Sequence, residues 1–468
     1  MCLMSIWTSQ EAVKATSGKL MGNPEWDVFG ICIDSRLVKK GDLFVALKGT
    51  KTDGHDYLRE AFIKGANAVM VEKIPQNFPS TSPILVVDDC IEALYHLAMQ
   101  RRQQTKAKVI ALTGSVGKTS TKEMLNLAFS SFGITHATLG NLNNEIGAPL
   151  SVARMPLDAE FGIFELGMNH ANEITPLSKL VQPQIAIITT VEEVHIENFN
   201  SIEEIAMAKA EIFDGMAEGG IAILNADNQF FTYLSAKARD CGLNVISFGA
   251  APGAQAKLLE YKENQKDSFV LARVGGKDVG YHIAAKGRHM AQNSLAVLAA
   301  VHAAGEDVEE AAAALSSFSG ASGRGQILQL SFNGGKITLI DDSYNASPVS
   351  MRAALGNLGA LETKGRRVAV IGDMLELGAK SAQFHESLLS DVLHNQVDVV
   401  FTVGKFSKLL FDKLPQKIRG ESVETANEIL PILEKSLQAG DAVLMKSSHG
   451  TGLYKIVEQL TKVKENAI

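Results

Sequence analysis

A glycine-rich run that begins at Gly114 contains the residue types that hold a chain of phosphates. Its members are Gly114, Ser115, Val116, Gly117, Lys118, Thr119 and Ser120. Triphosphate binding needs closely spaced backbone N–H groups, a helix N-terminus, a mobile cation and a hydroxyl for magnesium, and this run supplies all four. The most common form of the loop has another glycine six residues before the lysine, where this chain has Leu112, so that subtype is not matched. The alternative is a glycine turn in front of a purely structural helix.

Glu165 ends an apolar run, at the kind of position where strands of parallel sheets meet their ligands. A carboxylate there suits a hard cation such as Mg²⁺, and a solvated or capping carboxylate is the alternative. Only the neighbouring glycine loop favours the magnesium interpretation. His195 and Lys209 follow along the chain, and each taken singly is typical of polar surface.

Further polar candidates lie towards the C-terminus. Asp342 and Asn345 come directly after the apolar run 337–340, a common place for ligand contacts, although a plain turn is an alternative. Arg324 lies in a glycine-flanked joint and has the reach to contact a phosphate, whereas a surface ion pair of small value is the alternative. Asn293 opens an alanine-rich helix, where it either contacts the edge of a base or packs as an ordinary first-turn residue.

These candidates must be positioned by strands and helices, which the apolar pattern predicts. Short apolar runs bounded by turn residues indicate strands. We expect strands at 31–33, 43–47, 68–71, 84–87, 109–112, 162–165, 185–189, 221–224, 337–340, 368–371, 399–403 and 442–445. We expect helices at 91–100, 119–132 and 293–304, and a polar linker at 101–106.

Alternation of strands and helices predicts an α/β protein with mainly parallel sheets. A chain of 468 residues exceeds what one hydrophobic core usually serves. The polar stretch near residue 105 and the small-residue segment 316–325 divide it into three expected domains. Their expected limits are residues 1–104, 105–322 and 323–468.

Composition narrows the class of protein. The formal charge of -7 provides no basic excess for a nucleic-acid backbone, so a general nucleic-acid binder is disfavoured. The 4 cysteines form no C-x-x-C pair and suit a reducing compartment. No apolar run has the length of a membrane span, and the N-terminus lacks the charged start of a secretory signal. We therefore expect a cytosolic protein without membrane insertion.

Taken together, these motifs resemble the Mur ligases of peptidoglycan synthesis. The resemblance is carried by residues 33–36, 41–47, 53–56, 113–120, 140–144, 165–167, 195–209, 342–346 and 372–378. It covers nearly the whole chain, and the strings at 342–346 and 372–378 are the most specific. It implies an N-terminal αβ domain that holds the UDP end of the substrate, a central P-loop domain for ATP and Mg²⁺, and a Rossmann-like C-terminal domain that closes over the site.

The resemblance also implies roles for single residues. ATP is assigned to the glycine loop with Asn293, Arg324, Asp342 and Asn345. Catalysis is assigned to Lys118, Glu165, His195 and Lys209. The implied magnesium ligands are Thr119, Glu165, His195 and Lys209, the last as a carbamate (N6-carboxylysine), which converts a cation into an anion. Implied substrate-binding residues are Ser35, Arg36, Lys48, Asp53, His55, Asn141, Asn143 and Asn144.

The chain departs from the family pattern at three places. Met290 and Ser347 each stand where the family usually has asparagine, and Ser447 interrupts an expected lysine-glycine-serine string. These differences weaken the contacts expected at those exact positions and leave the reaction class untouched.

The resemblance implies a reaction in two chemical steps. A monomeric enzyme joins D-alanyl-D-alanine to the free carboxylate of a UDP-N-acetylmuramoyl-tripeptide through an acyl phosphate, giving the pentapeptide, ADP and phosphate. Activation by ATP is needed because a carboxylate is a poor electrophile, and the protein contributes charge neutralisation and alignment. The rivals are a related ligase that adds a single amino acid, or glutamate to folate, and a nucleotide-dependent switch that forms no bond.

Overall fold

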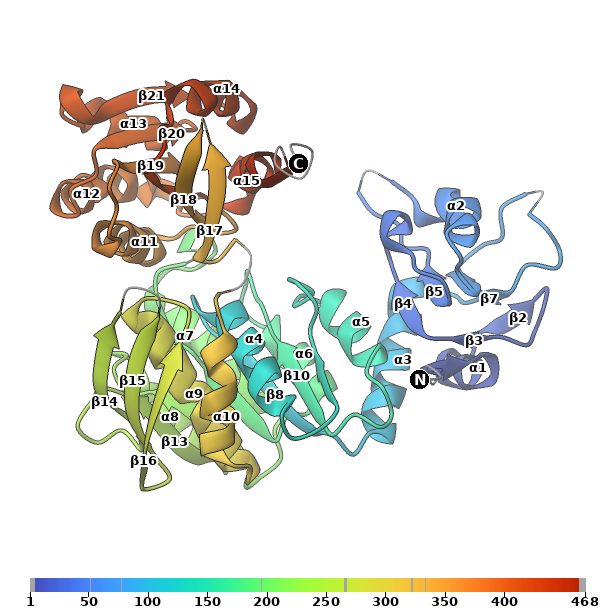
Figure 1. The fold of residues 1–468 in the computed structure, drawn as a ribbon. Helices are drawn as coiled ribbons and strands as arrows, with labels where there is room; N and C mark the ends of the chain where they lie inside the picture. Colours follow the sequence, from blue (N-terminus) through green and yellow to red (C-terminus); the bar gives the residue numbers. More distant parts are fainter. Residues whose placement is uncertain are drawn as a thin grey trace.

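The computed structural model describes residues 5–50, 52–76, 78–194, 196–264, 267–320, 323–332 and 334–462. Figure 1 shows three αβ domains, with the N-terminal domain in blue, the central domain from cyan to yellow and the C-terminal domain in orange and red. The expected α/β class with mainly parallel sheets is confirmed. Among the described residues, every helix is too short or too polar to span a bilayer.

The N-terminal domain is built on a five-stranded sheet in the order β2-β7-β6-β5-β4. Its strands are β2 (Lys19–Met21), β4 (Gly30–Cys32), β5 (Asp42–Val45), β6 (Ala68–Val71) and β7 (Ile84–Val86), and its helices are α1 (Ser9–Thr16), α2 (Leu58–Ile63) and α3 (Cys90–Gln104). Only β2 pairs antiparallel within this sheet. A short ribbon of β1 (Trp7–Thr8) and β3 (Asp27–Val28) lies beside it. The four strands expected here are confirmed.

The linker expected at 101–106 is wrong for most of its length, because α3 continues to Gln104. Arg101 is only 1% exposed. Its guanidinium lies 4.3 Å from the ring centre of Trp7 and donates to the carbonyl of Ile6. A long aliphatic stem and a planar head let arginine pack where sequence polarity suggests solvent.

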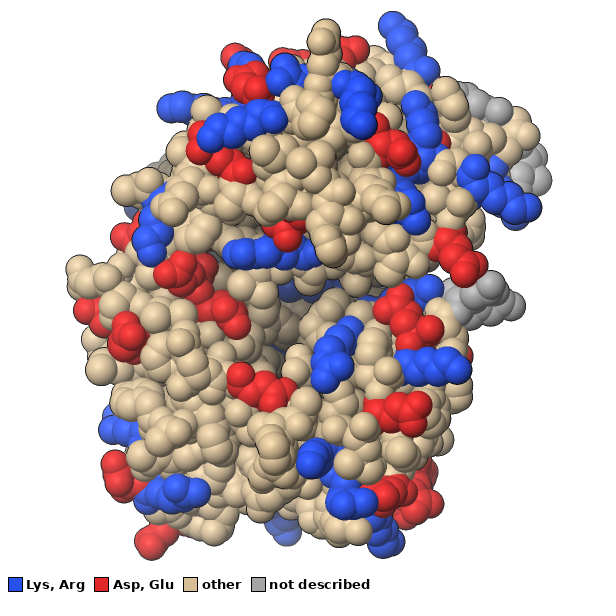
Figure 2. Space-filling view, turned by 90° about the vertical axis from the view of Figure 1, so that its left-hand side faces the viewer, with Lys and Arg blue, Asp and Glu red and all other residues tan. Residues whose placement is uncertain are grey.

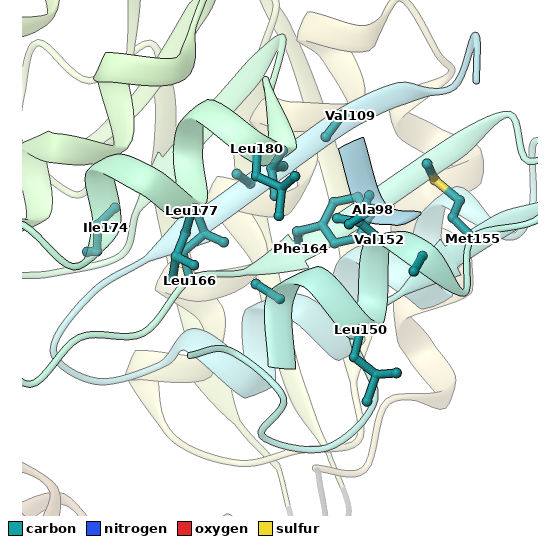
Figure 3. Close-up of a cluster of buried hydrophobic side chains, with 14 of the residues drawn as sticks. Ala98, Val109, Leu150, Val152, Met155, Phe164, Leu166, Ile174, Leu177 and Leu180 are labelled. Atoms are coloured by element: carbon teal, nitrogen blue, oxygen red, sulfur yellow. The ribbon is translucent and has the colours of Figure 1, made fainter. Parts of the chain in front are cut away.

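One hydrophobic core continues from the N-terminal domain into the central domain. The Trp7 indole N–H donates to the Ala153 carbonyl at 2.9 Å, and Arg154 Nε donates to the Ile31 carbonyl at 2.6 Å. Figure 3 shows Ala98 of α3 beside Phe164 and the apolar side chains of two central-domain helices. The first two domains therefore share buried surface rather than meeting through a flexible joint.

The central domain contains a nine-stranded sheet in the order β16-β15-β14-β13-β12-β11-β8-β10-β9. Its strands are β8 (Lys108–Thr113), β9 (Thr135–Ala137), β10 (Phe161–Glu165), β11 (Ile185–Ile188), β12 (Ile221–Asn225), β13 (Asn244–Gly249), β14 (Ala256–Glu263), β15 (Ser268–Val274) and β16 (Lys277–Ile283). Its helices are α4 (Lys118–Phe129), α5 (Gly147–Ala153), α6 (Ile174–Val181), α7 (Ile202–Ala210), α8 (Phe231–Asp240), α9 (Arg288–Ala304) and α10 (Val308–Ala314). Strands β14 to β16 form an antiparallel extension that the apolar pattern did not predict.

The C-terminal domain has a six-stranded sheet in the order β17-β18-β22-β19-β20-β21, parallel except for β17. Its strands are β17 (Gln326–Phe332), β18 (Gly335–Asp342), β19 (Arg367–Gly372), β20 (Val399–Val403), β21 (Arg419–Val423) and β22 (Ala442–Lys446). Its helices are α11 (Pro348–Ala360), α12 (Ser381–His394), α13 (Ser407–Lys413), α14 (Ala426–Ser436) and α15 (Leu453–Lys462). The four strands expected in this domain are confirmed.

The C-terminal domain contacts the central domain through the segment after β11. Lys380 Nζ lies 3.1 Å from Glu193 Oε1, and Ile196 packs against the C-terminal core. A Cβ atom added to Gly378 would lie 3.2 Å from the Cβ of Glu197. Figure 2 shows a hollow between the upper and lower parts of the molecule, with charged side chains of both signs around it.

Candidate active site

The glycine loop connects β8 to α4 and is closed on itself. Gly117 has a φ of +85°, which favours glycine, and a Cβ atom there would lie 2.9 Å from Asn293 Oδ1. Lys118 Nζ donates to the Gly114 carbonyl at 2.6 Å. Thr189 Oγ1 donates to the Val116 carbonyl at 2.6 Å. The loop is therefore preformed, and Asn293 lies directly against it.

Leu112 occupies the position at which the common subtype of the loop has its extra glycine. It is a fully buried residue of β8 and pairs in register with Glu165 of β10 and Ile187 of β11. The position therefore belongs to the central strand rather than to the loop. Glycine there would weaken the strand and remove a side chain from the core.

Glu165 is 1% exposed and is held from two sides. Thr119 Oγ1 donates to its Oε2 at 3.0 Å, and Asn143 Nδ2 donates to its Oε1 at 2.8 Å. The glycine loop and the carboxylate, separated in sequence, therefore meet because β8 and β10 are adjacent parallel strands. The arrangement presents a hydroxyl and a carboxylate, the oxygen ligands that Mg²⁺ prefers.

The half-buried Lys118 lies close to this carboxylate, and the buried Lys209 lies close to Lys118. Burial lowers the pKa of Lys118, Arg324 lowers this pKa further, and Glu165 opposes the change. Lys209, on α7, is 2% exposed. Burial holds the pKa of Lys209 well below its usual range, and the charge of Lys118 contributes to the same shift. A bound anion would favour the charged form of both lysines and so raise their pKa values.

The C-terminal domain contributes Arg324, whose guanidinium lies 4.4 Å from the ring centre of Tyr344. The ring of Tyr344 also lies 5.1 Å from that of His449. The charge of Arg324 lowers the pKa of Lys118 in the central domain and opposes the rise in the pKa of Asp342 in the C-terminal domain. An arginine stacked on an aromatic ring is preorganised to meet a phosphate.

Asp342 and Asn345 both contact Lys446, a buried residue that sequence reasoning did not single out. Lys446 Nζ lies 2.7 Å from Asp342 Oδ2 and donates to the Asn345 carbonyl at 3.1 Å. Burial raises the pKa of Asp342, and Lys446 and Arg324 oppose the rise. Burial and the charge of Lys446 lower the pKa of His289 to about 4. Lys446 is the lysine of the lysine-glycine-serine string that Ser447 interrupts, but the sequence did not indicate its burial against Asp342.

The substrate-binding candidates of the N-terminal domain each contact local partners. His55 Nδ1 is 2.6 Å from Asp53 Oδ1, and His55 Nε2 accepts from the Glu72 N–H at 3.0 Å. Lys48 forms a backbone bridge with Asp53. The Arg36 guanidinium pairs with Asp34 at 2.6 Å and is exposed. The buried residue Ser35 accepts from Lys64 through its carbonyl.

The remaining candidates divide between the site and its surroundings. Ser115 Oγ donates to the Glu192 carbonyl at 3.0 Å, which ties the glycine loop to the segment that contacts the C-terminal domain. Ser120 is buried on α4, Asn141 is exposed, and Asn144 Oδ1 accepts from the Gly147 N–H at the start of α5. His195 lies outside the described residues.

The three departures from the family pattern have structural environments of their own. Met290 is buried in the core beneath α9. Ser347 caps α11, since its Oγ accepts from the Ser350 N–H at 3.4 Å. Ser447 is fully buried, and a Cβ atom added to Gly372 would lie 2.5 Å from its Cβ.

A three-domain fold with a phosphate loop, a carboxylate and cations at the strand ends is typical of nucleotide-dependent ligases, and the comparisons agree. The Mur ligase middle domain matches residues 112–301, the Mur ligase glutamate ligase domain matches residues 323–449, and the Mur ligase catalytic domain matches residues 27–111. The chain belongs to the Mur ligase family.

Several relatives within the family share one name. UDP-N-acetylmuramoyl-tripeptide–D-alanyl-D-alanine ligase of Rickettsia prowazekii is 38% identical over 91% of this chain and 93% of the relative. The ligase of the same name from Bacillus subtilis is 33% identical over 96% of each chain. A MurF crystal structure from Acinetobacter baumannii has a TM-score of 0.83 and 31% identity over 99% of this chain and 100% of its own. A MurF ligase from Thermotoga maritima in complex with ADP has a TM-score of 0.75 and 26% identity over 94% of this chain and 98% of its own.

Proposed function

We propose that this chain joins D-alanyl-D-alanine to the free carboxylate of a UDP-N-acetylmuramoyl-tripeptide, with ATP converted to ADP and phosphate. Relatives that cover more than nine-tenths of the chain carry this function in their names. The observation that carries the proposal is the meeting of Lys118, Thr119 and Glu165 at the ends of two adjacent strands. Arg324 faces this group from the C-terminal domain.

In the first step, a carboxylate oxygen of the tripeptide attacks the γ-phosphorus of ATP. The bond to the β,γ-bridging oxygen breaks, leaving ADP and an acyl phosphate. Lys118 and Arg324 supply positive charge where the transferring phosphoryl group passes. Asn293, packed against Gly117, is in a position to contact the nucleotide.

In the second step, the amine of D-alanyl-D-alanine attacks the acyl carbon. The bond to phosphate breaks, phosphate leaves with both bonding electrons, and the amine loses a proton. Water competes for the same carbon, so the C-terminal domain serves the reaction by excluding it. The contacts of Gly378 and Lys380 with Glu197 and Glu193, in the segment after β11, support this role.

Thr119 and Glu165 fit a magnesium ion. They supply a hydroxyl and a carboxylate already in contact at 3.0 Å. The described residues contain no cluster of three or more histidine, cysteine or acidic side chains that forms a metal cage. This agrees with Mg²⁺, which is usually held by one or two carboxylates together with substrate phosphates. When bound, the ion neutralises charge on those phosphates.

Lys209 is proposed to act as a carbamate. Its lowered pKa favours the neutral amine, which is the form that adds CO₂ with loss of a proton. The product is an anion beside Lys118, so the modification gives Lys118 an attractive partner. The carboxylate formed in this way would add an oxygen ligand near Glu165.

The incoming dipeptide is proposed to bind in a cavity of about 440 Å³ at the strand ends of the C-terminal domain. Lys405 and Lys455 in its wall suit the carboxylate of the dipeptide, and Glu424 suits its ammonium. The cavity borders Gly450, which follows His449 in the chain. The ring of His449 lies 5.1 Å from that of Tyr344, which Arg324 also contacts, so these side chains connect the cavity with Arg324.

The domain limits near 105 and 323, a monomeric state and a cytoplasmic location are parts of the same proposal. The limits fall between the sheets described above. A cytoplasmic location follows from the use of ATP. Burial and nearby carboxylates raise the pKa of the Cys90 thiol to about 12, which keeps it protonated and unreactive.

Product analysis tests the function directly. Purified protein with ATP, Mg²⁺, a UDP-N-acetylmuramoyl-tripeptide and D-alanyl-D-alanine should form the pentapeptide, detected by mass spectrometry, with one phosphate released per amide. Omission of either substrate should abolish steady phosphate release. Equal hydrolysis in the absence of both substrates would favour a nucleotide-dependent switch instead. Single amino acids and folate test the related ligases.

A further inference from the structure

Lys122 is a buried cation that the proposed mechanism does not use. It lies on α4, one helical turn after Lys118, and its side chain is 0% exposed. Its Nζ donates to the Thr138 carbonyl at 2.8 Å and to the Gly140 carbonyl at 3.2 Å. It also pairs with the partly exposed Glu123 at 2.8 Å. A buried ammonium is costly, so a lysine at this place needs a reason beyond filling space.

The segment that Lys122 contacts, residues 138–143, holds Glu165 at two points. Thr138 Oγ1 accepts from the Glu165 backbone N–H at 3.3 Å. Asn143 Nδ2 donates to Glu165 Oε1 at 2.8 Å. The same segment is joined to the chain beyond Glu165, because the Gly167 N–H donates to the Asn143 carbonyl at 2.8 Å.

Helix α4 holds the other carboxylate oxygen, through Thr119. The Glu165 carboxylate is therefore gripped between α4 and segment 138–143, and Lys122 is a side chain of α4 bonded to two carbonyls of that segment. Its position sets the separation of the two elements and hence the orientation of the carboxylate. A methionine at 122 would keep the stem but leave both carbonyls without this donor.

We propose that Lys122 is a positioning residue that orients Glu165 for the divalent cation by fixing segment 138–143 to the phosphate-loop helix. This inference rests on the proposed role of Glu165 as a magnesium ligand. It assigns no contact between Lys122 and either the nucleotide or the ion. Outer contacts of this type commonly change metal affinity by about 10- to 100-fold when removed.

The test uses the full-length protein with ADP and Mn²⁺ as the probe. Free Mn²⁺ is measured by electron paramagnetic resonance, and ADP binding in EDTA is measured by calorimetry. Lys122→Met should weaken Mn²⁺ binding about tenfold or more, while ADP affinity in EDTA stays within about twofold. Hydrogen exchange in 138–144 should accelerate, because the segment loses its anchor. Glu123→Gln, which leaves both carbonyl contacts, should match the wild type.

A double-variant cycle separates positioning from a general structural role. If Lys122 acts through Asn143, the double variant Lys122→Met with Asn143→Ala should lose no more Mn²⁺ affinity than the single variant that shows the larger loss. Additive losses, or wild-type Mn²⁺ binding in Lys122→Met, would overturn the proposal. If Lys122→Met does not fold, Lys122→Gln takes its place with the same expectations, because its shorter neutral side chain cannot span both carbonyls.

The probe also separates this inference from the proposed function. Mn²⁺ binding with ADP needs neither the tripeptide nor the amine. Failure to form the amide would therefore reject the substrates and leave the Lys122 result standing. If the Glu165→Gln variant instead binds Mn²⁺ as tightly as the wild type, the metal role of Glu165 on which the inference rests is wrong.

Discussion

The central and C-terminal domains each contribute lysines to the candidate site, but their charges have different partners. Lys446 of the C-terminal domain is paired with Asp342 at 2.7 Å. Among the residues that the structure describes, neither Lys118 nor Lys209 forms an ion pair, and the charge of Lys118 lowers the pKa of Lys209. The paired lysine contributes to the cohesion of its own domain, whereas the unpaired lysines are available to the anion that the proposed function requires.

Substitution of Lys118 is expected to have the largest effect. Lys118→Met removes the cation closest to the glycine loop, and loss of one such group from a phosphoryl-transfer site should lower kcat by about 10³-fold. The rate of ADP formation with both substrates present measures the effect. Circular dichroism of the variant should match the wild type, because the loop keeps the Thr189 contact. A rate within tenfold of the wild type would contradict the assignment.

Asp342→Asn tests the paired lysine. It leaves Lys446 buried without an anion, which should lower the free energy of unfolding by about 3 kcal/mol. Urea denaturation of the C-terminal domain in the full chain measures the change. Asp278→Asn, which breaks an exposed pair with Arg273, is the matched control and should change stability by less than about 1 kcal/mol. Equal effects of the two variants would show that the burial of Lys446 is unimportant.

The unpaired lysine Lys209 should reveal itself through pH. The pKa of Lys209 is lowered in the folded protein, so the unfolded chain binds one more proton than the folded chain at intermediate pH. The free energy of unfolding therefore rises as pH increases towards the ordinary lysine pKa of about 10.4. Lys209→Met lacks this slope. In CO₂-free buffer the variant should be more stable than the wild type by about 1–3 kcal/mol at neutral pH, and the difference should shrink as pH rises. Thermal unfolding across that range checks the sign, and a constant difference would contradict it.

The smallest effect is expected where the two domains touch. Lys380 and Glu193 form an exposed pair, so Lys380→Ala should change the free energy of unfolding by less than about 1 kcal/mol and kcat by less than about threefold. Lys408→Ala, which breaks a surface pair within α13, is the control. A much larger change in kcat for Lys380→Ala alone would show that this contact governs domain closure.

The sequence predicted the parts of this molecule that depend on local pattern. Apolar runs located the parallel strands, and the expected proximity of the glycine loop and Glu165 is confirmed, because parallel strand ends meet at one edge of a sheet. Leu112 was correctly placed in a strand. The end of the helix expected at 91–100 was misjudged, since α3 continues to Gln104 and the packing of Arg101 on Trp7 depends on tertiary contacts. The burial of Lys122 and Lys446 was not predicted for the same reason, because only tertiary contacts distinguish a buried lysine from a solvated one.

The core shared by the first two domains has a consequence for how the chain is made. Trp7 completes its hydrogen bonding only with Ala153, a residue 146 positions later. A nascent chain that emerges from the ribosome N-terminus first therefore cannot finish its first domain until much of the second has appeared. Until then the indole and the apolar face of α3 stay uncovered, which makes this early stretch of translation the stage at which a chaperone has most to protect.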